Sequence, residues 1–319
     1  MKTLSIAIPS FNVEKYLQRC LDSLLYDESI HELLDVIIVN DGSVDNTLKI
    51  AKYYENKYSC VSVVDKKNGG HGSTVNAALR IAKGKYFKVI DSDDWVNIFD
   101  FPDFVKSLSE ENADIIVTNY RRDILYDNSV DKFVFTNSDT AELNIDTIDN
   151  LKNKENFFFE FSMHSMAVKT ESLKNVWGKG LLENTFYVDQ QYVALSLLCA
   201  KTYRLKNYDI YRYFIGRPDQ SMNPESFYKH RKDHERVLMW LLELYDSREL
   251  SNKEYLKNVL KKQVTLMLKT HYRIYNTKNH KKSINELKAF DRFLSKTYPD
   301  IKKPNIIMHF IKVNNGDEE

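Results

Sequence analysis

The chain has 319 residues, of which 43% are hydrophobic and 29% charged, a composition typical of a folded globular protein with one large domain or two moderate ones. No apolar run approaches the ~20 residues needed to cross a bilayer, and the apolar stretch at the start is too short for a signal peptide. Three widely separated cysteines without metal-ligand spacing are typical of reduced thiols, so we expect a cytoplasmic protein.

The net charge of +1 hides an asymmetry between the two parts of the chain. From Glu225 to the end there are 20 Lys and Arg against 13 Asp and Glu, or +7, which leaves −6 for the first 224 residues. An acidic first part fits a metal site. A basic tail fits either an anionic partner or a solvated helical surface.

Short apolar runs and helical periodicity alternate over about the first 95 residues. The predicted strands are Leu4–Ile8, Asp35–Val39, Val61–Val64 and Tyr86–Ile90. The predicted helices between them are 16–25, 46–56 and 74–83, the second of them capped by Asp45 or Ser43. This order predicts an α/β fold with a mostly parallel sheet and helices on both faces.

A polar segment follows each of these four strands. The segments are Pro9-Ser10-Phe11-Asn12, Asn40-Asp41-Gly42-Ser43, Lys67–Ser73 and Asp91-Ser92-Asp93-Asp94. Because ligands bind beyond the carboxyl ends of parallel strands, we expect the four segments to form one site.

Three carboxylates stand within four residues where the fourth strand ends. Asp91, Asp93 and Asp94 repel one another and are costly beside a hydrophobic sheet. A hard divalent cation such as Mn²⁺ or Mg²⁺ would relieve that repulsion, since such ions choose oxygen ligands and often share them with phosphates. The alternative interpretation is an acidic turn in which Asp94 caps the next helix.

The other three segments suit a nucleotide. Pro9–Asn12 and Asp41–Ser43 could hold a nucleoside, with Asp41 accepting a hydrogen bond from a base N–H. Gly69, Gly70 and Gly72 would let backbone N–H groups approach an anion at a helix N-terminus. The run is neither a Walker A loop nor a dinucleotide-binding fingerprint, and a plain tight turn is the alternative.

These four motifs, in this order, resemble the family 2 glycosyltransferases, which have the Rossmann-like GT-A fold. The resemblance implies inverting transfer of a sugar from a nucleotide-diphosphate donor, with an Asp-x-Asp motif at the metal. It places Asp41 at the base, Asp91 near the ribose or sugar, and Asp93 at the metal together with Asp91.

The resemblance also implies a set of residues on the donor side. They are Pro9, Ser10, Asn12, Asp41, Asn68, Gly69, Gly70, Ser73, Asp91, Ser92 and Arg217. Arg217 would face the diphosphate, and a surface arginine is the alternative. Many members have Ala-Arg-Asn in the helix after the glycine loop, where this chain has Thr74-Val75-Asn76. His71 or a loop backbone would then take the place of that arginine.

Inversion requires a base that removes the proton from the acceptor hydroxyl. In the family a carboxylate at the start of a helix does this. Here the pair Val188-Asp189 makes Asp189 the predicted base, with Glu183 as the second candidate. A helix N-cap is the alternative role for Asp189, and it is compatible with catalysis.

The acceptor side is expected in residues 120–224. Strands are predicted at 113–119, 132–135 and 209–214, and the polar stretch 123–154 has no assigned role. Further candidates for contacts with either substrate are Asp94, Trp95, His71, His164 and Gln220. For His164, packing against its neighbours is the alternative.

From Glu225 onward the periodicity predicts three helices. We therefore expect a catalytic domain over 1–224, with a nucleotide-sugar half (1–119) and an acceptor half (120–224), and a helical region over 225–319. Basic residues of this region are Lys261, Lys262, Lys281, Lys282, Lys302 and Lys303.

Together with the apolar Ile306–Met308, the basic helices could meet the inner face of a membrane that presents a lipid-linked acceptor. Homodimerisation, or packing onto the catalytic domain, explains the apolar stripes equally well. The sequence shows no basic groove lined with aromatic residues, which is the feature that would indicate a nucleic-acid partner.

The sequence thus predicts a metal-dependent, inverting glycosyltransferase that uses a nucleotide-diphosphate sugar. A hexose or N-acetylhexosamine, with UDP favoured by the resemblance, would move to a hydroxyl of a glycan, lipid-linked or glycoprotein acceptor in cell-surface polysaccharide synthesis.

A sugar nucleotidyltransferase would need a Gly-rich loop after the first strand, which Pro9–Asn12 lacks. A non-catalytic nucleotide-sugar-binding module would need neither Asp189 nor the Asp-x-Asp motif. The glycine fingerprint of a nicotinamide-dependent oxidoreductase is also missing.

Overall fold

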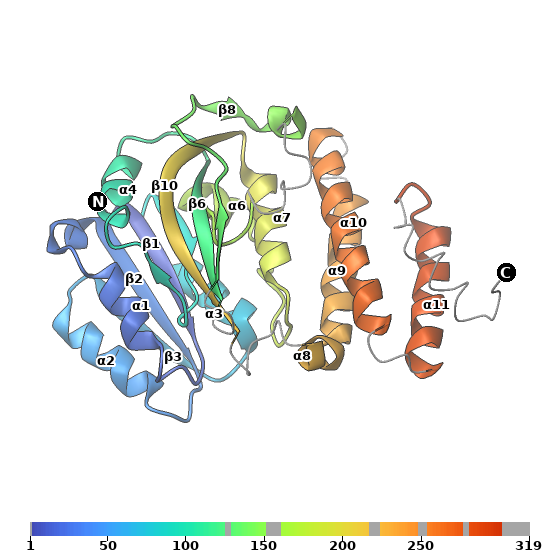
Figure 1. Cartoon of the computed structure of the whole chain (residues 1–319), viewed down its shortest axis with the longest axis horizontal. Helices are drawn as coiled ribbons and strands as arrows, with labels where there is room; N and C mark the ends of the chain where they lie inside the picture. The colour runs from blue at the N-terminus through green and yellow to red at the C-terminus, as the bar shows by residue number, and fades with distance from the viewer. Residues whose placement is uncertain are drawn as a thin grey trace. The chain divides into compact units, whose positions relative to one another are not determined.

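The structure is a computed structural model that describes residues 2–124, 129–150, 161–216, 224–247, 254–276 and 281–301. The chain divides into two compact units, Met1–Arg217 and Pro218–Glu319, which are described separately. Figure 1 shows an α/β first unit and a helical second unit. The predicted α/β fold with a helical C-terminal region is therefore confirmed, and the predicted domain boundary at residue 224 stays a prediction.

The first half of the central sheet is built from four parallel strands. They are β1 (Leu4–Ser10), β2 (Leu34–Asp41), β3 (Val61–Lys66) and β4 (Tyr86–Val89), in the order β3-β2-β1-β4. Every residue of β1 and β2 is buried, as expected for strands covered on both faces. The strands reach further than predicted, so that Ser10 and Asp41 are the last residues of β1 and β2 rather than loop residues.

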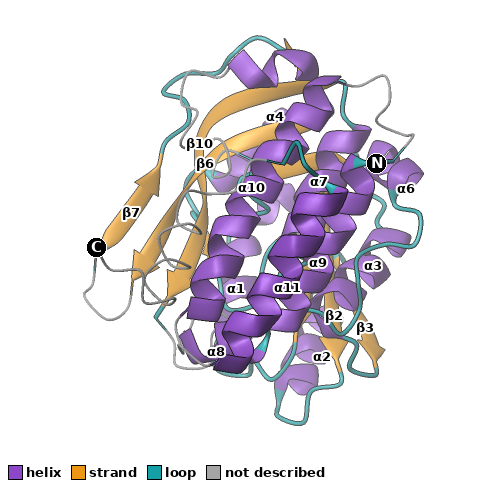
Figure 2. Cartoon of the chain, turned by 90° about the vertical axis from the view of Figure 1, so that its right-hand side faces the viewer, coloured by secondary structure: helices purple, strands orange, loops and turns teal. Residues whose placement is uncertain are grey.

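The second half of the sheet is mixed. Its strands are β5 (Trp95–Val96), β6 (Ile115–Ile124), β7 (Val130–Phe133), β8 (Leu143–Asn144), β9 (Met166–Lys169) and β10 (Thr202–Ile215). β9 lies antiparallel between β4 and β6, and β10 runs parallel to β6. Figure 2 shows β7 beside the long strands β6 and β10 at this side of the sheet.

Helices cover both faces of the sheet. Those on one face are α1 (Leu17–Leu24), α2 (Thr47–Lys57), α4 (Phe101–Leu108) and the 3₁₀ helix η1 (Glu28–Leu33). Their apolar residues share one buried core with Leu4, Ile6 and Ile8 of β1. The other helices are α3 (Gly70–Ile81), α6 (Thr170–Val176), α7 (Asp189–Cys199) and a second 3₁₀ helix, η2 (Ile145–Asn150). In Figure 1, α6 and α7 lie across the sheet from α1 and α2.

The start of α3 differs from the prediction. This helix begins at Gly70 and not at Thr74, so the glycines lie in its first turn. The Asp41 carboxylate, at the end of β2, accepts hydrogen bonds from the backbone N–H groups of Gly69 and Gly70, at 3.0 and 2.8 Å. A side chain distant in sequence therefore satisfies N–H groups that a local N-cap residue would otherwise bind.

The second unit is helical, as predicted. It contains α8 (Pro224–Lys229), α9 (Arg231–Tyr245), α10 (Glu254–Asn276) and α11 (Lys281–Thr297), and α10 packs against both α9 and α11. The buried side chains at this packing include Val237, Leu241, Val264, Leu268, Phe290 and Leu294. None of the described helices combines the length and the apolar character needed to cross a bilayer. The predicted basic pair Lys302-Lys303 and the apolar Ile306–Met308 lie outside the described residues.

A lysine lies in the middle of the first unit's core. The side chain of Lys88, on β4, is fully buried, and its ammonium donates hydrogen bonds to the carbonyl oxygens of His164 and Met166, at 2.7 and 3.1 Å. Burial lowers the pKa of Lys88 to about 7. The folded chain therefore binds fewer protons at this side chain than the unfolded chain does between about pH 7 and pH 10.5.

This difference predicts how stability depends on pH. The free energy of unfolding should rise with pH across that window, by at most about 1.4 kcal/mol per pH unit from this one group. Lys88→Met should remove this contribution in urea unfolding curves measured from pH 7 to pH 10. Lys88→Gln keeps an N–H donor and should show the same loss. Parallel slopes for the wild type and both variants would contradict the prediction.

Candidate active site

The acidic turn that follows β4 is held from several sides. The backbone N–H of Asp94 donates to the Asp91 carbonyl oxygen at 3.0 Å. The Tyr211 hydroxyl, from β10, donates to Asp94 Oδ2 at 2.5 Å and accepts from the backbone N–H of Asp91 at 3.2 Å. Arg19, from α1, donates to the Asp93 carbonyl oxygen at 2.8 Å. The turn therefore has a defined shape before any ligand binds.

Asp94 is the buried member of the acidic triplet. Its side chain is fully enclosed, and Oδ1 accepts a hydrogen bond from the backbone N–H of Phe214 at 2.8 Å. Burial, followed by the charges of Asp93 and Asp91, raises the pKa of Asp94 well above its usual value. Asp94 thus joins the turn to β10 with both oxygens and does not cap a following helix.

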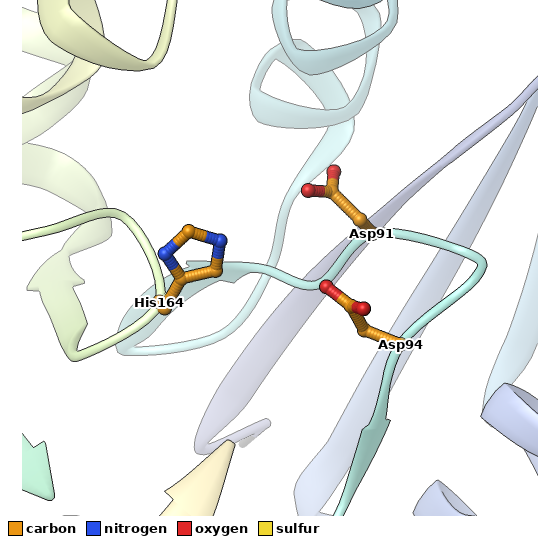
Figure 3. Close-up of side chains that lie close together, drawn as sticks. All are labelled: Asp91, Asp94 and His164. Atoms are coloured by element: carbon orange, nitrogen blue, oxygen red, sulfur yellow. The ribbon is translucent and has the colours of Figure 1, made fainter. Parts of the chain in front are cut away.

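Asp91, Asp94 and His164 each offer a donor atom, and these atoms lie within 4.8 Å of one another. Figure 3 shows the two carboxylates at the two ends of the turn and the imidazole facing them from another segment. Carboxylate oxygens with one imidazole nitrogen fit Mn²⁺. Burial is the main cause of the raised pKa of Asp94, and the charges of Asp93 and Asp91 add a repulsion that a cation would relieve. Asp93, the metal ligand expected from the sequence, is not part of this group, and its role stays a prediction.

His164 is also packed among aromatic rings. Its imidazole stacks on Tyr213 at 4.4 Å between centroids and meets the edge of Tyr211 at 4.8 Å. Burial lowers the pKa of His164 to about 4, so the ring is neutral at physiological pH. The packing interpretation of this residue therefore holds, and a neutral imidazole also remains able to bind a metal.

Asp189 is the first residue of α7, and Val188 occupies the N-cap position. The Val188 side chain makes no capping hydrogen bond and Asp189 lies inside the helix, so the alternative role of Asp189 as the N-cap residue is wrong. Burial raises the pKa of Asp189 above its usual value, although Gln190 opposes this by donating to Asp189 Oδ2 at 3.0 Å. A carboxylate with a raised pKa is a better proton acceptor. Glu183, the second candidate, is exposed.

His71 contacts the acidic turn through Asp91, and its pKa also responds to the charge of Asp189. Its Nε2 lies 2.8 Å from Asp91 Oδ1. Burial lowers the pKa of His71, but the carboxylates of Asp91, Asp189 and Asp93 outweigh burial and raise it above its usual value. The carboxylates predicted for the metal and for the base therefore act on the same imidazole, which places them at one site.

The resemblance implies that Asp41 contacts a nucleobase, whereas in the structure Asp41 binds groups of the protein itself. Besides the N–H groups of Gly69 and Gly70, its Oδ1 accepts from Lys66 Nζ at 2.6 Å, and the same ammonium donates to Ser73 Oγ at 2.8 Å. The anion at the start of α3 is thus Asp41 itself. Contacts of Asp41, Gly69, Gly70 and Ser73 with a nucleotide stay predictions.

The first two segments bind each other. The backbone N–H of Asn12 donates to Ser43 Oγ at 3.0 Å, and Asn12 Oδ1 accepts from the backbone N–H of Val44 at 2.9 Å. Asn12 has a φ of 52°, which an asparagine tolerates. Pro9 and Ser10 are the last two residues of β1 and Asn68 follows β3, so all three lie at the same carboxyl edge. The structure thus brings the four predicted segments together.

Three residues around the site were missed by the sequence analysis. Tyr211 closes the acidic turn, Lys66 binds Asp41, and Arg19 places its guanidinium 3.8 Å from the centre of the Trp95 ring. Each contact joins separate elements, so periodicity gives no sign of it. Arg217 and Gln220 lie outside the described residues, and Ser92 is buried within the turn.

The loop before α7 approaches α3 unusually closely. Asn76 Oδ1 accepts from the backbone N–H of Leu181 at 2.8 Å, and the backbone N–H of Asn184 donates to the Gly69 carbonyl oxygen at 2.6 Å. A Cβ added to Gly72 would lie 2.2 Å from the Leu182 carbonyl oxygen. Glycine is therefore needed at position 72 so that the loop before α7 can pass close to α3. This is a second reason for the run of glycines, besides the start of the helix.

Comparison with known proteins agrees with this geometry. The family model described as "Glycosyl transferase family 2" matches residues 5–174, more than half of the chain, so the chain belongs to this family. Its fold is GT-A: the structure of Staphylococcus aureus TarS 1-349 in complex with UDP-GlcNAc superposes with a TM-score of 0.61 at 22% identity, covering 86% of this chain and 73% of that one. The predicted family and fold are confirmed.

Sequence relatives cover a smaller part of the chain. TarS of Staphylococcus aureus, a poly(ribitol-phosphate) beta-N-acetylglucosaminyltransferase, is 33% identical over 118 residues, which are 37% of this chain and 21% of that protein. Chondroitin synthase of Pasteurella multocida is 41% identical over 108 residues, 34% of this chain and 11% of that protein. The matched segments thus span 21% and 11% of these two relatives.

The close approach at Gly72 can be tested without substrate. Gly72→Ala should push the loop at Leu182 away from α3 at a cost of about 1–3 kcal/mol, which speeds hydrogen exchange of the Leu181 and Asn184 amides about 5- to 150-fold. Arg80→Ala, at an exposed position of the same helix, is the control. Equal exchange in both variants would contradict this role of Gly72.

Proposed function

We propose that this chain is a metal-dependent, inverting glycosyltransferase that moves a sugar from a nucleotide-diphosphate donor to an acceptor hydroxyl. The observation that carries the proposal is the meeting of the acidic turn with Asp189 around His71, at the carboxyl edge of a GT-A sheet. Family membership supports the reaction class, and the site supplies residues for its two halves.

The acceptor half of the reaction belongs to Asp189. Its carboxylate takes the proton of the acceptor hydroxyl while that oxygen attacks the anomeric carbon, and the bond from this carbon to the diphosphate oxygen breaks. Attack comes from the face opposite the nucleotide, so the configuration inverts. The raised pKa of Asp189 suits it to hold that proton. Gln190, which donates to Asp189, orients the carboxylate.

The donor half belongs to the acidic turn. Asp91 and Asp93 would hold a Mn²⁺ or Mg²⁺ ion, and Asp94 organises the turn because both its oxygens already accept hydrogen bonds from β10. When bound, such an ion neutralises charge on the departing nucleotide diphosphate. His71 fixes the orientation of the Asp91 carboxylate by hydrogen bonding to it.

The nature of the substrates is part of the proposal. UDP is the favoured nucleotide, supported by the similarity to the UDP-GlcNAc complex of TarS, with a hexose or N-acetylhexosamine as the sugar. A second solved structure, a mannosyltransferase from Pyrobaculum calidifontis in complex with GDP-Man and Mn²⁺, has a TM-score of 0.51 at 13% identity and covers 93% of this chain and 81% of that one. It supports the divalent ion and keeps GDP-sugars among the donors to test.

The acceptor is proposed to be a glycan, lipid-linked or glycoprotein hydroxyl in cell-surface polysaccharide synthesis. The chain would work in the cytoplasm, where nucleotide sugars are made, with the basic C-terminal region contacting the inner face of the membrane. A screen of UDP-, GDP- and dTDP-sugars for binding and hydrolysis, with and without Mn²⁺, tests the proposal. Metal-dependent selection of one donor supports it, and absence of any binding counts against it.

The base assignment predicts a specific loss. Asp189→Asn should lower transfer about 10²- to 10⁴-fold, because the amide cannot accept the acceptor proton, while calorimetric affinity for the donor nucleotide changes little. Glu183→Gln, at an exposed position of the segment that precedes α7, is the control and should keep wild-type turnover. Wild-type turnover by Asp189→Asn would remove Asp189 from this role.

The ion has two candidate ligand sets, Asp91 with Asp93, or Asp91 with Asp94 and His164. Each set predicts that different variants lose Mn²⁺ binding. Asp93→Asn should keep its melting temperature and lose the Mn²⁺-dependent part of nucleotide binding, at least about tenfold by titration calorimetry. Asp94→Asn should instead lower the melting temperature, since it disturbs a buried carboxyl bonded to Tyr211 and Phe214. If His164→Ala loses Mn²⁺ dependence and Asp93→Asn does not, the ion lies in the group of Asp91, Asp94 and His164.

A further inference from the structure

Arg19 belongs to the exposed side of α1, yet its guanidinium reaches the acidic turn. The buried residues of this helix include Leu17, Leu21 and Leu24, whereas Arg19 is exposed. A side chain of this length can lay its stem along the protein and place its charged end elsewhere. Arg19 Nη2 donates a hydrogen bond to the carbonyl oxygen of Asp93 at 2.8 Å, across 74 residues of sequence.

Two aromatic rings hold the guanidinium in place. Its carbon lies 3.8 Å from the centre of the Trp95 ring and 4.6 Å from the centre of the Phe214 ring. The centres of the two rings are 5.7 Å apart. A guanidinium can contact aromatic faces and donate a directed hydrogen bond at the same time, because it is planar and carries several N–H groups. We call Arg19, Trp95 and Phe214 the Arg19 cluster.

The Arg19 cluster contacts the acidic turn at three places. Arg19 bonds to the backbone of Asp93, and Trp95 directly follows Asp94 in the sequence. The backbone N–H of Phe214 donates to Asp94 Oδ1 at 2.8 Å. The cluster therefore joins both α1 and β10 to the turn that follows β4.

The charge of Arg19 also acts on the turn. Burial lowers the pKa of Arg19, and the charges of Asp94 and Asp93 oppose that effect. A guanidinium keeps its positive charge in proteins, so Arg19 reduces the repulsion among these carboxylates. Its hydrogen bond goes to the Asp93 carbonyl oxygen and not to the carboxylate. Arg19 therefore does not compete with a metal ion for the carboxylate oxygens.

We propose that Arg19 is a positioning residue for the divalent ion of the donor half. It holds the main chain at Asp93, so that the carboxylates of the acidic turn are oriented for the ion before the ion binds. This inference rests on the proposed function. Removing a group that orients metal ligands without touching the metal typically lowers metal affinity about 10- to 100-fold.

Two substitutions separate the features of the guanidinium. Arg19→Met keeps an unbranched apolar stem but loses the charge and the hydrogen-bond donors. Arg19→Lys keeps a charge and a donor but loses the planar group that contacts Trp95 and Phe214. Arg80→Met is the matched control, since Arg80 is an exposed arginine in the last turn of α3.

The experiment measures Mn²⁺ binding to the full chain by titration calorimetry. The first titration uses Mn²⁺ alone, and the second adds the nucleotide of the donor selected by the screen. Neither requires turnover, so both report on the ion site itself. Donor hydrolysis is then followed over a range of Mn²⁺ concentrations.

Arg19→Met should weaken Mn²⁺ binding about 10-fold, and the Mn²⁺ concentration for half-maximal hydrolysis should rise by the same factor. Hydrolysis at saturating Mn²⁺ should approach that of the wild type, because the ion then selects the oriented turn at the expense of affinity. Arg19→Lys should show a smaller shift in the same direction, and Arg80→Met should match the wild type. If Arg19→Met does not fold, the shift in Arg19→Lys carries the same test.

Unchanged Mn²⁺ affinity in the Arg19 variants would overturn the inference. A loss of hydrolysis that saturating Mn²⁺ does not restore would also overturn it, because that result indicates a general structural role. Failure of the proposed function looks different: the wild type itself would then show no Mn²⁺-dependent binding or hydrolysis of any donor.

Discussion

The repulsion among carboxylates at one edge of the sheet is the constraint on which this structure depends. Asp91, Asp93, Asp94 and Asp189 are close enough to influence the same neighbouring side chains. Each negative charge near another costs free energy, more so where water is excluded. The surrounding groups oppose that cost: the Tyr211 hydroxyl and a backbone N–H hold Asp94, and the His71 imidazole bonds to Asp91. A divalent ion would complete the compensation.

Close backbone approach is the second requirement. The loop from Leu181 to Val188 leads directly to the proposed base, Asp189, and it passes α3 because Gly72 leaves space for the Leu182 carbonyl and because Asn76 binds the loop backbone. The helix that begins at Gly70 therefore contributes to both halves of the reaction. Its first turn places His71 at the acidic turn, where the donor is proposed to bind. Asn76 in its next turn binds the backbone of the loop that leads to Asp189, the proposed base for the acceptor.

A buried aromatic layer connects these charges to the rest of the sheet. Tyr211 and Tyr213 belong to β10, whose pairing with β6 is interrupted by register shifts between Lys206 and Tyr211. Irregularities of this kind re-aim side chains next to active sites. In β10, Tyr211 bonds to Asp94 of the acidic turn and Tyr213 stacks on His164, so the same strand contacts two of the candidate metal ligands.

Local patterns in the sequence predicted the four strands of the first 95 residues and the three α-helices between them, although not the 3₁₀ helix η1 or the exact start of α3. They also predicted the polar segment after each strand and the edge at which these segments meet. These follow from short-range periodicity and from the rule that parallel strands end at one edge. The sequence also marked Asp91 and Asp189, because a carboxylate at the end of a strand or the start of a helix is visible in a local pattern.

Only the tertiary structure decided which side chains meet. Asp41 binds the backbone at the start of α3, 28 residues on, and Tyr211 bonds to Asp94 across 117 residues. Such contacts depend on strand order, on register shifts and on where a glycine permits close approach, none of which leaves a periodic signal. For that reason the early start of α3, the role of Gly72 and the stacking of His164 on Tyr213 could not be read from the sequence.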